Sequence, residues 1–348
     1  MSMEKAEIVS KSDDLELEEP WDDEFQKLVQ TSPKDRSLAG LDLYFYQGFW
    51  CTSRVLKAVI SFHKHLRPFD SDVILATVPK CGTTWLKALP FSILCRNQFA
   101  RDENHPLLTF GPHQLVRFLE YDLYLNNPCP DLETECVYRP RIFSTHVPYS
   151  FLPTSFKDSG CKIVFACRNP MDMFISLWFF QNNNRVESAE PLSLDEAFDK
   201  FCRGIYEFGP FFDQVLGYWK ASQENPDKIL FLQYEDLVED INSHLRSLAM
   251  FLGVPFTEDE EQQGVVEEIA KLCSFESLKE AEMKKKGMHA SGIPNSVFFR
   301  KGKVGDWSNY LTPSMVERLE KLIQEKLGDS GLTLKLSCKT TSKDIASA

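Results

Sequence analysis

The sequence lacks the features that identify membrane proteins and zinc proteins. None of its apolar runs approaches the ~20 residues that a helix needs to span a bilayer. Its seven histidines form neither an HExxH motif nor a Cys/His cluster of the kind that binds zinc. We therefore expect a protein with no membrane-spanning segment and no bound metal ion.

The sequence also has no CxxC pair, although it contains ten cysteines, which follow no regular spacing. The first residues, MSMEKAEIVSKSDD, do not include the apolar core of a signal peptide. A disulfide framework is therefore not expected, and the cysteines are interpreted as reduced thiols of a cytoplasmic protein.

Positive charge is in deficit, since the chain carries a net charge of −12 at pH 7. This charge disfavours binding to nucleic acids or to acidic membranes by bulk attraction. In contrast, no acidic residue lies between Met283 and Gly305, a stretch that contains Lys284, Lys285, Lys286, Arg300, Lys301 and Lys303. This stretch indicates a local anion site, although a solvated loop explains the run of three lysines equally well.

One large domain is the simplest interpretation of the chain. Residues 1–37 are acidic and polar, and are predicted to form a mobile N-terminal arm with a short helix around Trp21 to Val29. Aromatic residues become frequent from Leu41 onward, and no repeat or Pro/Gly/Ser-rich linker divides the remainder of the chain. We therefore expect a single domain over 38–335 and a flexible C-terminal tail over 336–348.

Three short apolar runs are predicted to be buried parallel strands: Val73 to Val78, Lys162 to Cys167 and Lys228 to Tyr234. Each is followed by a polar turn and a helical pattern, and residues 312–328 are predicted to form a further amphipathic helix. Strands that alternate with helices predict an α/β fold with a central parallel sheet and helices on both faces. In such sheets, ligands bind beyond the carboxyl ends of the strands.

The segment PKCGTTW, directly after the first strand, has the features of an anion site. Gly82 allows backbone N–H groups to approach an anion, and Thr83 and Thr84 add hydroxyl donors at the start of a helix. Lys80 adds a full positive charge, and Trp85 lies where it can stack on a base. A plain strand-to-helix turn capped by threonine is the alternative, but the combination of residues favours the anion site.

The segment after the second strand offers a second candidate phosphate site. Arg168 lies at the strand end, and Ser176 lies about two helical turns further on, near the same face of the helix. An arginine and a hydroxyl in this arrangement can bind a phosphate group. Taken alone, Arg168 is equally well explained by an ion pair with Asp172, four residues later.

Two further segments contain candidate site residues. In FFRKGKVGDW, Arg300 and Lys301 lie beside Gly302, which suits either a phosphate contact or a basic surface turn. In RPRIFSTHVP, His146 comes after a short extended run. Histidine is the usual general base at neutral pH, although a lone histidine is more often structural than catalytic.

Taken in order, PKCGTTW, THVP, CRNPMD and FFRKGKVGDW resemble the motifs of the cytosolic (soluble) sulfotransferase family. The resemblance covers about residues 41–327, and LDLYFYQGFW and the continuation TTWLKAL make it closest to the plant, flavonol-sulfotransferase-like branch. It implies the sulfotransferase fold, which is similar to that of nucleotide kinases with a P-loop. It also implies a cytoplasmic enzyme.

The resemblance implies that the donor is 3′-phosphoadenosine-5′-phosphosulfate (PAPS) and that 3′-phosphoadenosine-5′-phosphate (PAP) is the product. It assigns the 5′-phosphosulfate to Lys80, Cys81, Gly82, Thr83, Thr84 and Trp85, with Trp85 stacked on adenine. It assigns the 3′-phosphate to Arg168, Ser176, Arg300, Lys301 and Gly302. Tyr234, Ser274 and Phe275 are then expected at the adenine end, with Phe275 opposite Trp85.

The resemblance also implies an in-line transfer that needs no metal. His146 is expected to remove the proton from the acceptor hydroxyl, and Lys80 to stabilise the charge on the leaving phosphate. Phe180 is expected to line the acceptor pocket. The expected acceptor is a small apolar molecule, with phenolic flavonoids first, and steroid-like alcohols, hydroxyjasmonate or desulfo-glucosinolates next.

Some positions depart from the family pattern. Ser144 stands where many animal members have lysine, and Ser308 and Pro313 alter the family's dimerisation pattern, so we expect a monomer. Cys81 stands where many relatives have serine. It is either a small residue that fits the turn or a thiol whose pKa is lowered by the helix N-terminus and Lys80.

Two alternatives to a sulfotransferase remain. An ATP-dependent small-molecule kinase predicts magnesium dependence and a lysine after the last glycine of the loop, whereas Lys80 precedes Gly82. A nucleotide-binding protein without activity is the other alternative, but the presence of both His146 and Lys80 argues against it.

Overall fold

The computed structural model describes residues 22–99, 105–285 and 295–337. The chain divides into two units, Met1–Ser32 and Pro33–Ala348. The described part of the first unit contains helix α1 (Asp22–Thr31), close to the helix predicted around Trp21 to Val29. Residues 1–21 of the predicted arm and 338–348 of the predicted tail lie outside the described residues.

The second unit is built on a five-stranded parallel sheet. Its spatial order is β5 (Arg117–Phe118), β6 (Ile142–Thr145), β4 (Val73–Thr77), β7 (Lys162–Cys167) and β8 (Ile229–Gln233). The three predicted strands are therefore present, side by side, as β4, β7 and β8. Strand β4 is buried along its whole length, as expected for a central strand with a helix layer on each face.

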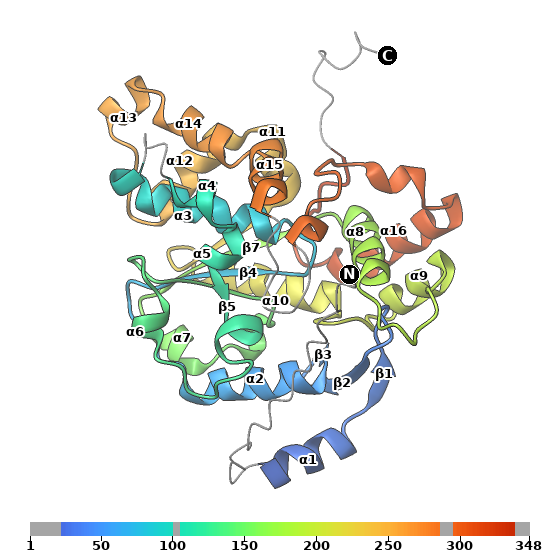
Figure 1. Cartoon of the computed structure of the whole chain (residues 1–348). Helices are drawn as coiled ribbons and strands as arrows, with labels where there is room; N and C mark the ends of the chain where they lie inside the picture. The colour runs from blue at the N-terminus through green and yellow to red at the C-terminus, as the bar shows by residue number, and fades with distance from the viewer. Residues whose placement is uncertain (1–21, 100–104, 286–294, 338–348) are drawn as a thin grey trace, which may run out of the picture. The chain divides into compact units, whose positions relative to one another are not determined.

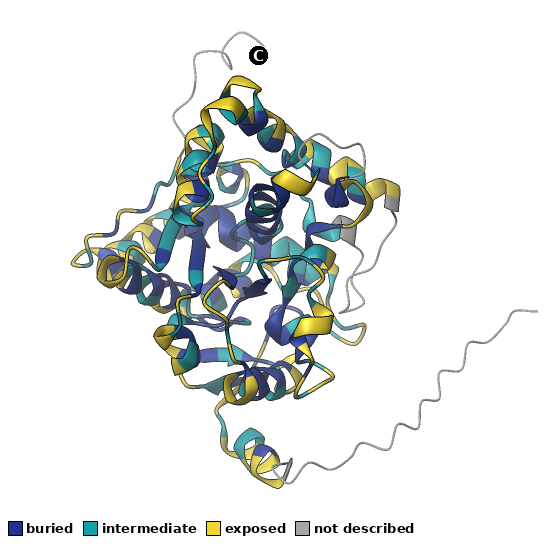
Figure 2. Ribbon diagram, turned by 90° about the vertical axis from the view of Figure 1, so that its left-hand side faces the viewer, coloured by how far each residue is buried: buried dark blue, intermediate teal, exposed yellow. Residues whose placement is uncertain are grey.

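Helices cover both faces of this sheet, which confirms the predicted α/β fold (Figure 1). On one face lie α3 (Thr83–Phe99), α12 (Ile241–Phe251) and α14 (Val265–Leu272), which share a hydrophobic core with alternate residues of the strands. On the other face lies α10 (Phe211–Glu224), where Tyr218 stacks on Phe165 of β7 with the ring centroids 4.1 Å apart. Figure 2 shows the buried residues concentrated in the sheet and on the helix faces that pack against it.

The remaining helices connect and surround these layers. They are α2 (Ser53–His65), α4 (Pro106–Thr109), α5 (Pro112–Leu115), the π-helix η1 (Leu119–Leu123), α6 (Leu132–Glu135), η2 (Tyr149–Phe151), α7 (Thr154–Asp158), α8 (Pro170–Asn183), α9 (Leu194–Cys202), α11 (Tyr234–Glu239), α13 (Glu258–Gln262), α15 (Phe275–Lys285), η3 (Asn295–Phe298), η4 (Asp306–Asn309) and α16 (Pro313–Leu327). No helix within the described residues is long and apolar enough to cross a membrane.

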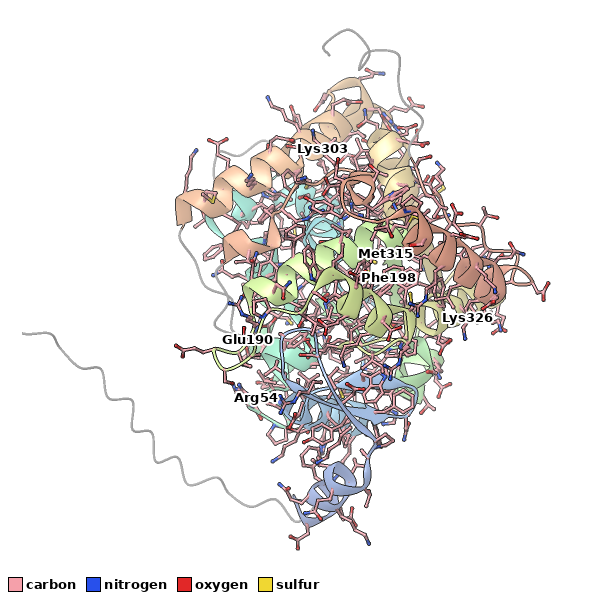
Figure 3. All side chains as sticks on the ribbon, turned by 90° about the vertical axis from the view of Figure 1, so that its right-hand side faces the viewer. Arg54, Glu190, Phe198, Lys303, Met315 and Lys326 are labelled. Atoms are coloured by element: carbon pink, nitrogen blue, oxygen red, sulfur yellow. The ribbon has the colours of Figure 1, made fainter. Side chains whose placement is uncertain are left out.

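Local sequence explains where the best-predicted helices begin. Helix α8 starts at Pro170, with the side chain of Asn169 as its N-cap, and α16 starts at Pro313, with Thr312 as its N-cap. Helix α16 packs against α9, and Figure 3 shows Phe198 of α9 near Met315 of α16. Both of these side chains are buried.

A small antiparallel sheet, which the sequence did not predict, precedes the large one. It contains β1 (Lys34–Arg36), β2 (Asp42–Tyr46) and β3 (Phe49–Cys51). The two-residue loop between β2 and β3, Gln47-Gly48, has positive φ angles of 43° and 97°, the signature of a tight hairpin turn. Strand β1 lies within the segment that was predicted to be an arm, so part of that segment is paired in a sheet.

The starts of β4 and β6 are joined by a buried ion pair. Arg141, directly before β6, donates from Nε and Nη2 to the two carboxylate oxygens of Asp72, directly before β4, at 2.8 and 2.6 Å. The side chains of Arg141 and Asp72 are 3% and 0% exposed. Removal of one partner therefore leaves the other charge buried without compensation.

We expect Arg141→Met to lower the free energy of unfolding by about 3–5 kcal/mol, because Asp72 then stays buried without its partner. Arg139→Met is the matched control. Arg139 pairs with Glu133 at 2.8 Å, but its side chain is 49% exposed, and loss of that pair should cost less than about 1 kcal/mol. Urea unfolding followed by circular dichroism measures both values, and equal losses would contradict the role given to the buried pair.

Candidate active site

The carboxyl ends of four neighbouring strands place the predicted site residues in one row. Lys80 comes shortly after the end of β4, while His146, Arg168 and Tyr234 come directly after β6, β7 and β8. Because the sheet order is β6-β4-β7-β8, these four residues lie along one edge. The predicted site residues therefore lie where parallel sheets usually bind their ligands, beyond the carboxyl ends of the strands.

A cavity of about 840 Å³ lies at this edge. It is lined by all the predicted site residues except Cys81: Lys80, Gly82, Thr83, Thr84, Trp85, His146, Arg168, Ser176, Phe180, Tyr234, Ser274, Phe275, Arg300, Lys301 and Gly302. Residues from distant parts of the sequence thus share one cavity. Its volume is typical of a site for a small molecule or a nucleotide.

The loop after β4 has an unusual backbone that glycine and close packing explain. Gly82 has a φ of 86°, and a Cβ atom on it would lie 2.7 Å from Cδ2 of Tyr234, so only glycine fits. Lys80 also has a positive φ, 69°, which is rare for a residue with a side chain. Such local strain is often found at functional sites.

The Lys80 side chain reaches into the cavity. Its Nζ lies 4.0 Å from the ring centroid of Phe180, the predicted acceptor-pocket residue. Burial, together with the nearby positive charges of Arg168 and Arg300, lowers the pKa of Lys80 to about 7. An anion bound beside these three cations would raise the lysine pKa again, so the charge arrangement fits an anionic ligand.

His146 is held in a defined orientation by the end of β4. Its Nδ1 lies 2.8 Å from the carbonyl oxygen of Thr77 and 3.2 Å from the hydroxyl of the same residue. Since a carbonyl oxygen only accepts, Nδ1 carries the proton in the neutral ring, and the lone pair lies on Nε2. The hydroxyl of Thr77 also bonds that of Thr83 at 2.8 Å, which links the histidine to the start of α3.

Arg168 fits both interpretations that the sequence left open. Its Nη2 lies 3.6 Å from Oδ2 of Asp172, so the structural ion pair is present. The same guanidinium donates to the carbonyl oxygen of Lys303 at 2.6 Å and lies 4.6 Å from the ring centroid of Tyr234. Its Nε is buried and has no hydrogen-bond partner among the described residues, although Arg168 lines the cavity. A buried N–H donor without a partner is available to donate a hydrogen bond to an acceptor oxygen of a ligand.

Hydrogen bonds to the side chain of Asp172 connect the segment 300–307 to the start of α8. Its carboxylate accepts hydrogen bonds from the backbone N–H groups of Gly305 at 2.7 Å and Trp307 at 3.0 Å. It also accepts one from the side chain of Asn169 at 3.0 Å. Asp172 is fully buried, so this carboxylate connects distant parts of the chain inside the protein.

Arg300 and Lys301 share an acidic partner at the cavity wall. Both bond the carboxylate of Asp306, with Lys301 Nζ 2.7 Å from Oδ1. Burial alone would raise the pKa of Asp306, but the two cations outweigh it and lower this pKa. The next residue, Gly302, has a φ of 67°, and a Cβ atom there would lie 2.5 Å from Phe275. Glycine is therefore required for this segment to pack on Phe275.

Three aromatic rings form the wall predicted for the adenine end. Trp85 contacts Tyr234 edge to face, with the centroids 5.5 Å apart, and the hydroxyl of Tyr234 donates to the carbonyl oxygen of Gly302 at 3.2 Å. Phe275 begins α15, where the Oγ of Ser274 accepts from the N–H of Ser277 at 3.2 Å. Aromatic faces of this kind stack on a base.

The sequence interpretation missed much of one side of the cavity, the side where Phe180 was expected to line the acceptor pocket. That side includes Phe118, Tyr121, Leu125, Glu207 and Phe298. Burial raises the pKa of Glu207 to about 7, and a hydrogen bond with Tyr121 opposes the shift. Apart from Phe298, which begins the segment FFRKGKVGDW, no motif quoted above contains these residues, because they come from separate parts of the chain that meet only in the fold. The aromatic residues of β2 and β3, Phe45, Tyr46, Phe49 and Trp50, do not line the cavity.

Cys81 is the one predicted site residue that does not line the cavity. Its side chain is 1% exposed, and burial raises the pKa of its thiol far above the usual value. This direction is opposite to the one that a reactive thiolate requires, so the structure favours the interpretation of Cys81 as a small residue that fits the turn.

Comparison with known proteins agrees with the site geometry. Residues 70–331 match the family model described as "Sulfotransferase domain". The chain is similar to cytosolic sulfotransferase 15 of Arabidopsis thaliana, with 50% identity over 317 residues, 90% of this chain and 88% of that protein. The predicted cytoplasmic location agrees with that name.

Two solved structures are also similar. A crystal structure of an Arabidopsis thaliana sulphotransferase has 37% identity and a TM-score of 0.71, covering 89% of this chain and 94% of that one. Mouse sulfotransferase SULT7A1 complexed with PAP has 26% identity and a TM-score of 0.63, covering 83% of this chain and 95% of that one.

We expect an alkylating reagent to modify Cys81 about tenfold or more slowly than Cys129, because Cys81 is buried with a raised thiol pKa and Cys129 is exposed. Peptide mass spectrometry of the folded protein measures both rates. Wild type and Cys81→Ser should be inactivated at the same rate, and Cys129→Ser is the control that removes the fast-labelling site. Protection of activity by Cys81→Ser would revive the reactive-thiol hypothesis.

Proposed function

Because this chain belongs to the sulfotransferase family, we propose that it transfers a sulfuryl group from PAPS to a hydroxyl group of a small, largely apolar acceptor. The observation that carries the proposal is the placement of Lys80 and His146 at the ends of adjacent strands, beside one cavity. When bound, the donor supplies the activated sulfuryl group. The chain's own residues bind it, orient it and move the acceptor proton.

The donor half of the cavity is the part lined by the cations and by Trp85, Tyr234 and Phe275. Arg168 has an unpaired buried Nε, and Lys80 has a lowered pKa, so this half offers positive charge that the described part of the protein does not fully compensate. We assign Arg168, Ser176 and the segment Arg300 to Gly302 to the 3′-phosphate. The PAP complex of the similar mouse enzyme supports this choice of nucleotide.

His146 is assigned as the general base. Its Nδ1 bond to the carbonyl oxygen of Thr77 leaves the Nε2 lone pair as the position that receives the acceptor proton. Proton transfer of this kind contributes about 10²–10⁴-fold to a rate. Lys80 is assigned to the phosphate oxygen on which charge develops during transfer, where a fixed cation stabilises the transition state more than the ground state.

The acceptor half is lined mainly by rings. Phe118, Tyr121 and Phe208 surround the imidazole of His146, with ring centroids 4.7, 6.2 and 5.5 Å from it. Of these rings, Phe118 and Tyr121 line the cavity together with Phe180 and favour a flat phenolic acceptor, and we propose flavonoids first. Steroid-like alcohols, hydroxyjasmonate and desulfo-glucosinolates are the next candidates. The carboxyl of Glu207, in the same wall, provides one polar contact for a second substituent of the acceptor.

An ATP-dependent kinase fits the site less well. The loop carries its lysine before Gly82, on a residue with positive φ, and the side chain contacts Phe180 and lies near the positive charges of Arg168 and Arg300. We further propose a monomer, since Ser308 and Pro313 alter the family's dimerisation pattern.

The function is tested by a transfer assay with sulfate-labelled PAPS and a panel of flavonols, steroids, hydroxyjasmonate and desulfo-glucosinolates. We expect turnover on at least one phenolic acceptor, no turnover with labelled ATP, and no effect of a chelator. His146→Ala should lower kcat by about 10²–10⁴-fold and leave the affinity for PAP within a few-fold. His65→Ala, an exposed histidine on α2, is the control. Strict magnesium dependence, or full activity of His146→Ala, would overturn the assignment.

Arg168→Met should weaken PAP binding by about 10–100-fold, because a charged hydrogen bond to the 3′-phosphate is lost. Binding of adenosine 5′-monophosphate, which has no 3′-phosphate, should change by less than about threefold. Isothermal titration calorimetry measures both affinities. Arg203→Met, whose arginine has a 57% exposed side chain and pairs with Asp199, is the control. Equal losses for the two nucleotides would remove Arg168 from the 3′-phosphate site.

A further inference from the structure

Lys87 is a fully buried lysine that none of the roles above explains. It lies on α3 in the segment TTWLKAL, and its side chain is 0% exposed. Its Nζ lies 3.4 Å from the ring centroid of Phe118 and has no hydrogen-bond partner within the described part of the chain. A buried ammonium group is costly unless an acidic group compensates it, so its neighbours decide what it does.

The acidic groups that compensate Lys87 lie on η1. Burial lowers the pKa of Lys87 to about 7, and the charges of Asp122 and Glu120 oppose this shift. Glu120 is itself 0% exposed. Lys87 on α3, the helix after the anion loop, and Glu120 on the π-helix beside β5 and β6 are thus both buried and interact through charge, without a hydrogen bond between them.

Glu120 is bonded directly to the candidate base. Its Oε1 accepts the backbone N–H of His146 at 2.6 Å, and the hydroxyl of Thr145 also bonds the carboxylate. The carbonyl oxygen of His146 accepts from the side chain of Gln214. Both backbone polar groups of His146 are therefore held by buried side chains, and one of these, Glu120, is ionisable.

The register of the sheet places these groups together. Phe118 of β5 is the pairing partner of Ser144 of β6, shortly before His146, and Lys87 lies over the Phe118 ring. The same ring lies 4.7 Å from the imidazole of His146, centroid to centroid. Phe118 thus lies in contact with both the buried cation and the base.

We propose that Lys87 and Glu120 are positioning residues for His146. The ammonium group of Lys87 keeps Glu120 ionised, and the carboxylate of Glu120 then fixes the backbone of His146 and places a negative charge beside its imidazole. The proposal rests on the proposed role of His146 as the base, and it adds a charge relation that the motifs do not contain.

The groups around Glu120 determine how readily its carboxylate takes up a proton. Burial raises the pKa of Glu120, and the N–H of His146, the hydroxyl of Thr145 and the charge of Lys87 all oppose this rise. The other titratable groups that face Glu120 are Tyr121 and Asp122 on its own element and Tyr218 on α10. Without Lys87, Glu120 takes up a proton more readily, and the negative charge beside His146 is lost.

The negative charge of Glu120 also determines the direction of the pH effect on activity. A nearby negative charge stabilises the imidazolium form and raises the pKa of His146. Since a base must be neutral to accept a proton, activity is lost as the pH falls through this pKa. Removal of the charge should therefore move the acid limb of the pH profile to lower pH.

The experiment compares Lys87→Met, Glu120→Gln and the double variant in the full chain. Each single change should lower kcat about tenfold, leave the KM for PAPS within about twofold, and shift the acid limb of kcat down by about half a pH unit. The double variant should be no worse than the poorer single variant, because the pair acts as a unit. Glu120→Gln keeps an amide oxygen for the N–H of His146, so it tests the charge with little disturbance of the fold.

Arg96→Met is the matched control. Arg96 is also a buried cation on α3, and it pairs with Glu260 at 2.7 Å rather than with η1. It should lower stability and leave the pH profile unchanged. If Glu120→Gln leaves kcat and the acid limb unchanged, or if the effects of Lys87→Met and Glu120→Gln add, the proposal is wrong.

A readout without turnover separates the positioning role from the proposed function. Titration of the His146 ring protons by nuclear magnetic resonance, in the PAP-saturated protein, should show a lower pKa in Glu120→Gln than in wild type. The shift is expected even if no acceptor is ever sulfated. An unchanged His146 titration in a folded variant would overturn the positioning role, whatever the assay shows.

Discussion

The carboxylate of Asp172 is the contact on which the arrangement of the donor half depends. It lies on the first turn of α8 and accepts the N–H groups of Gly305 and Trp307. It thereby holds the segment 300–307 against the end of β7, so that Arg168 and Arg300 line the same cavity. Loss of this carboxylate would be destabilising, because each backbone N–H group left unpaired in the interior costs free energy of folding.

The contacts of Asp172 and Asp306 with the cations explain why the cavity is suited to bind an anion. Asp172 and Asp306 compensate the cations from outside the cavity, so Arg168, Arg300 and Lys301 are held in place without their charge being cancelled. Lys80 has no such acidic partner among the described residues, and burial together with the charges of Arg168 and Arg300 lowers its pKa. Electrostatic preorganisation of this type is the main way in which group-transfer enzymes lower a barrier.

The acceptor half is organised around His146 rather than around the cations. Thr77 orients its ring, Glu120 holds its backbone, and Phe118 lies against both the ring and Lys87. All three of these residues lie in strands or helices rather than in loops. His146 is therefore held in one position, and Tyr121 and Glu207 line the cavity beside it.

The sequence by itself predicted three of the five parallel strands, the helix that begins at Pro313, the family and the residues expected at the donor site. It did so because each depends on a local pattern: an apolar run, a capping residue, or a loop motif at a strand end. The small sheet of β1 to β3, the cavity wall around His146 and the placement of Lys87 near Glu120 were decided only by the tertiary structure. No sequence pattern indicates that these residues meet, and packing alone brings them together. Burial likewise decided between the two interpretations of Cys81 in favour of a small residue that fits the turn. The raised pKa of its thiol is a property of the fold around it and not of its neighbours in sequence.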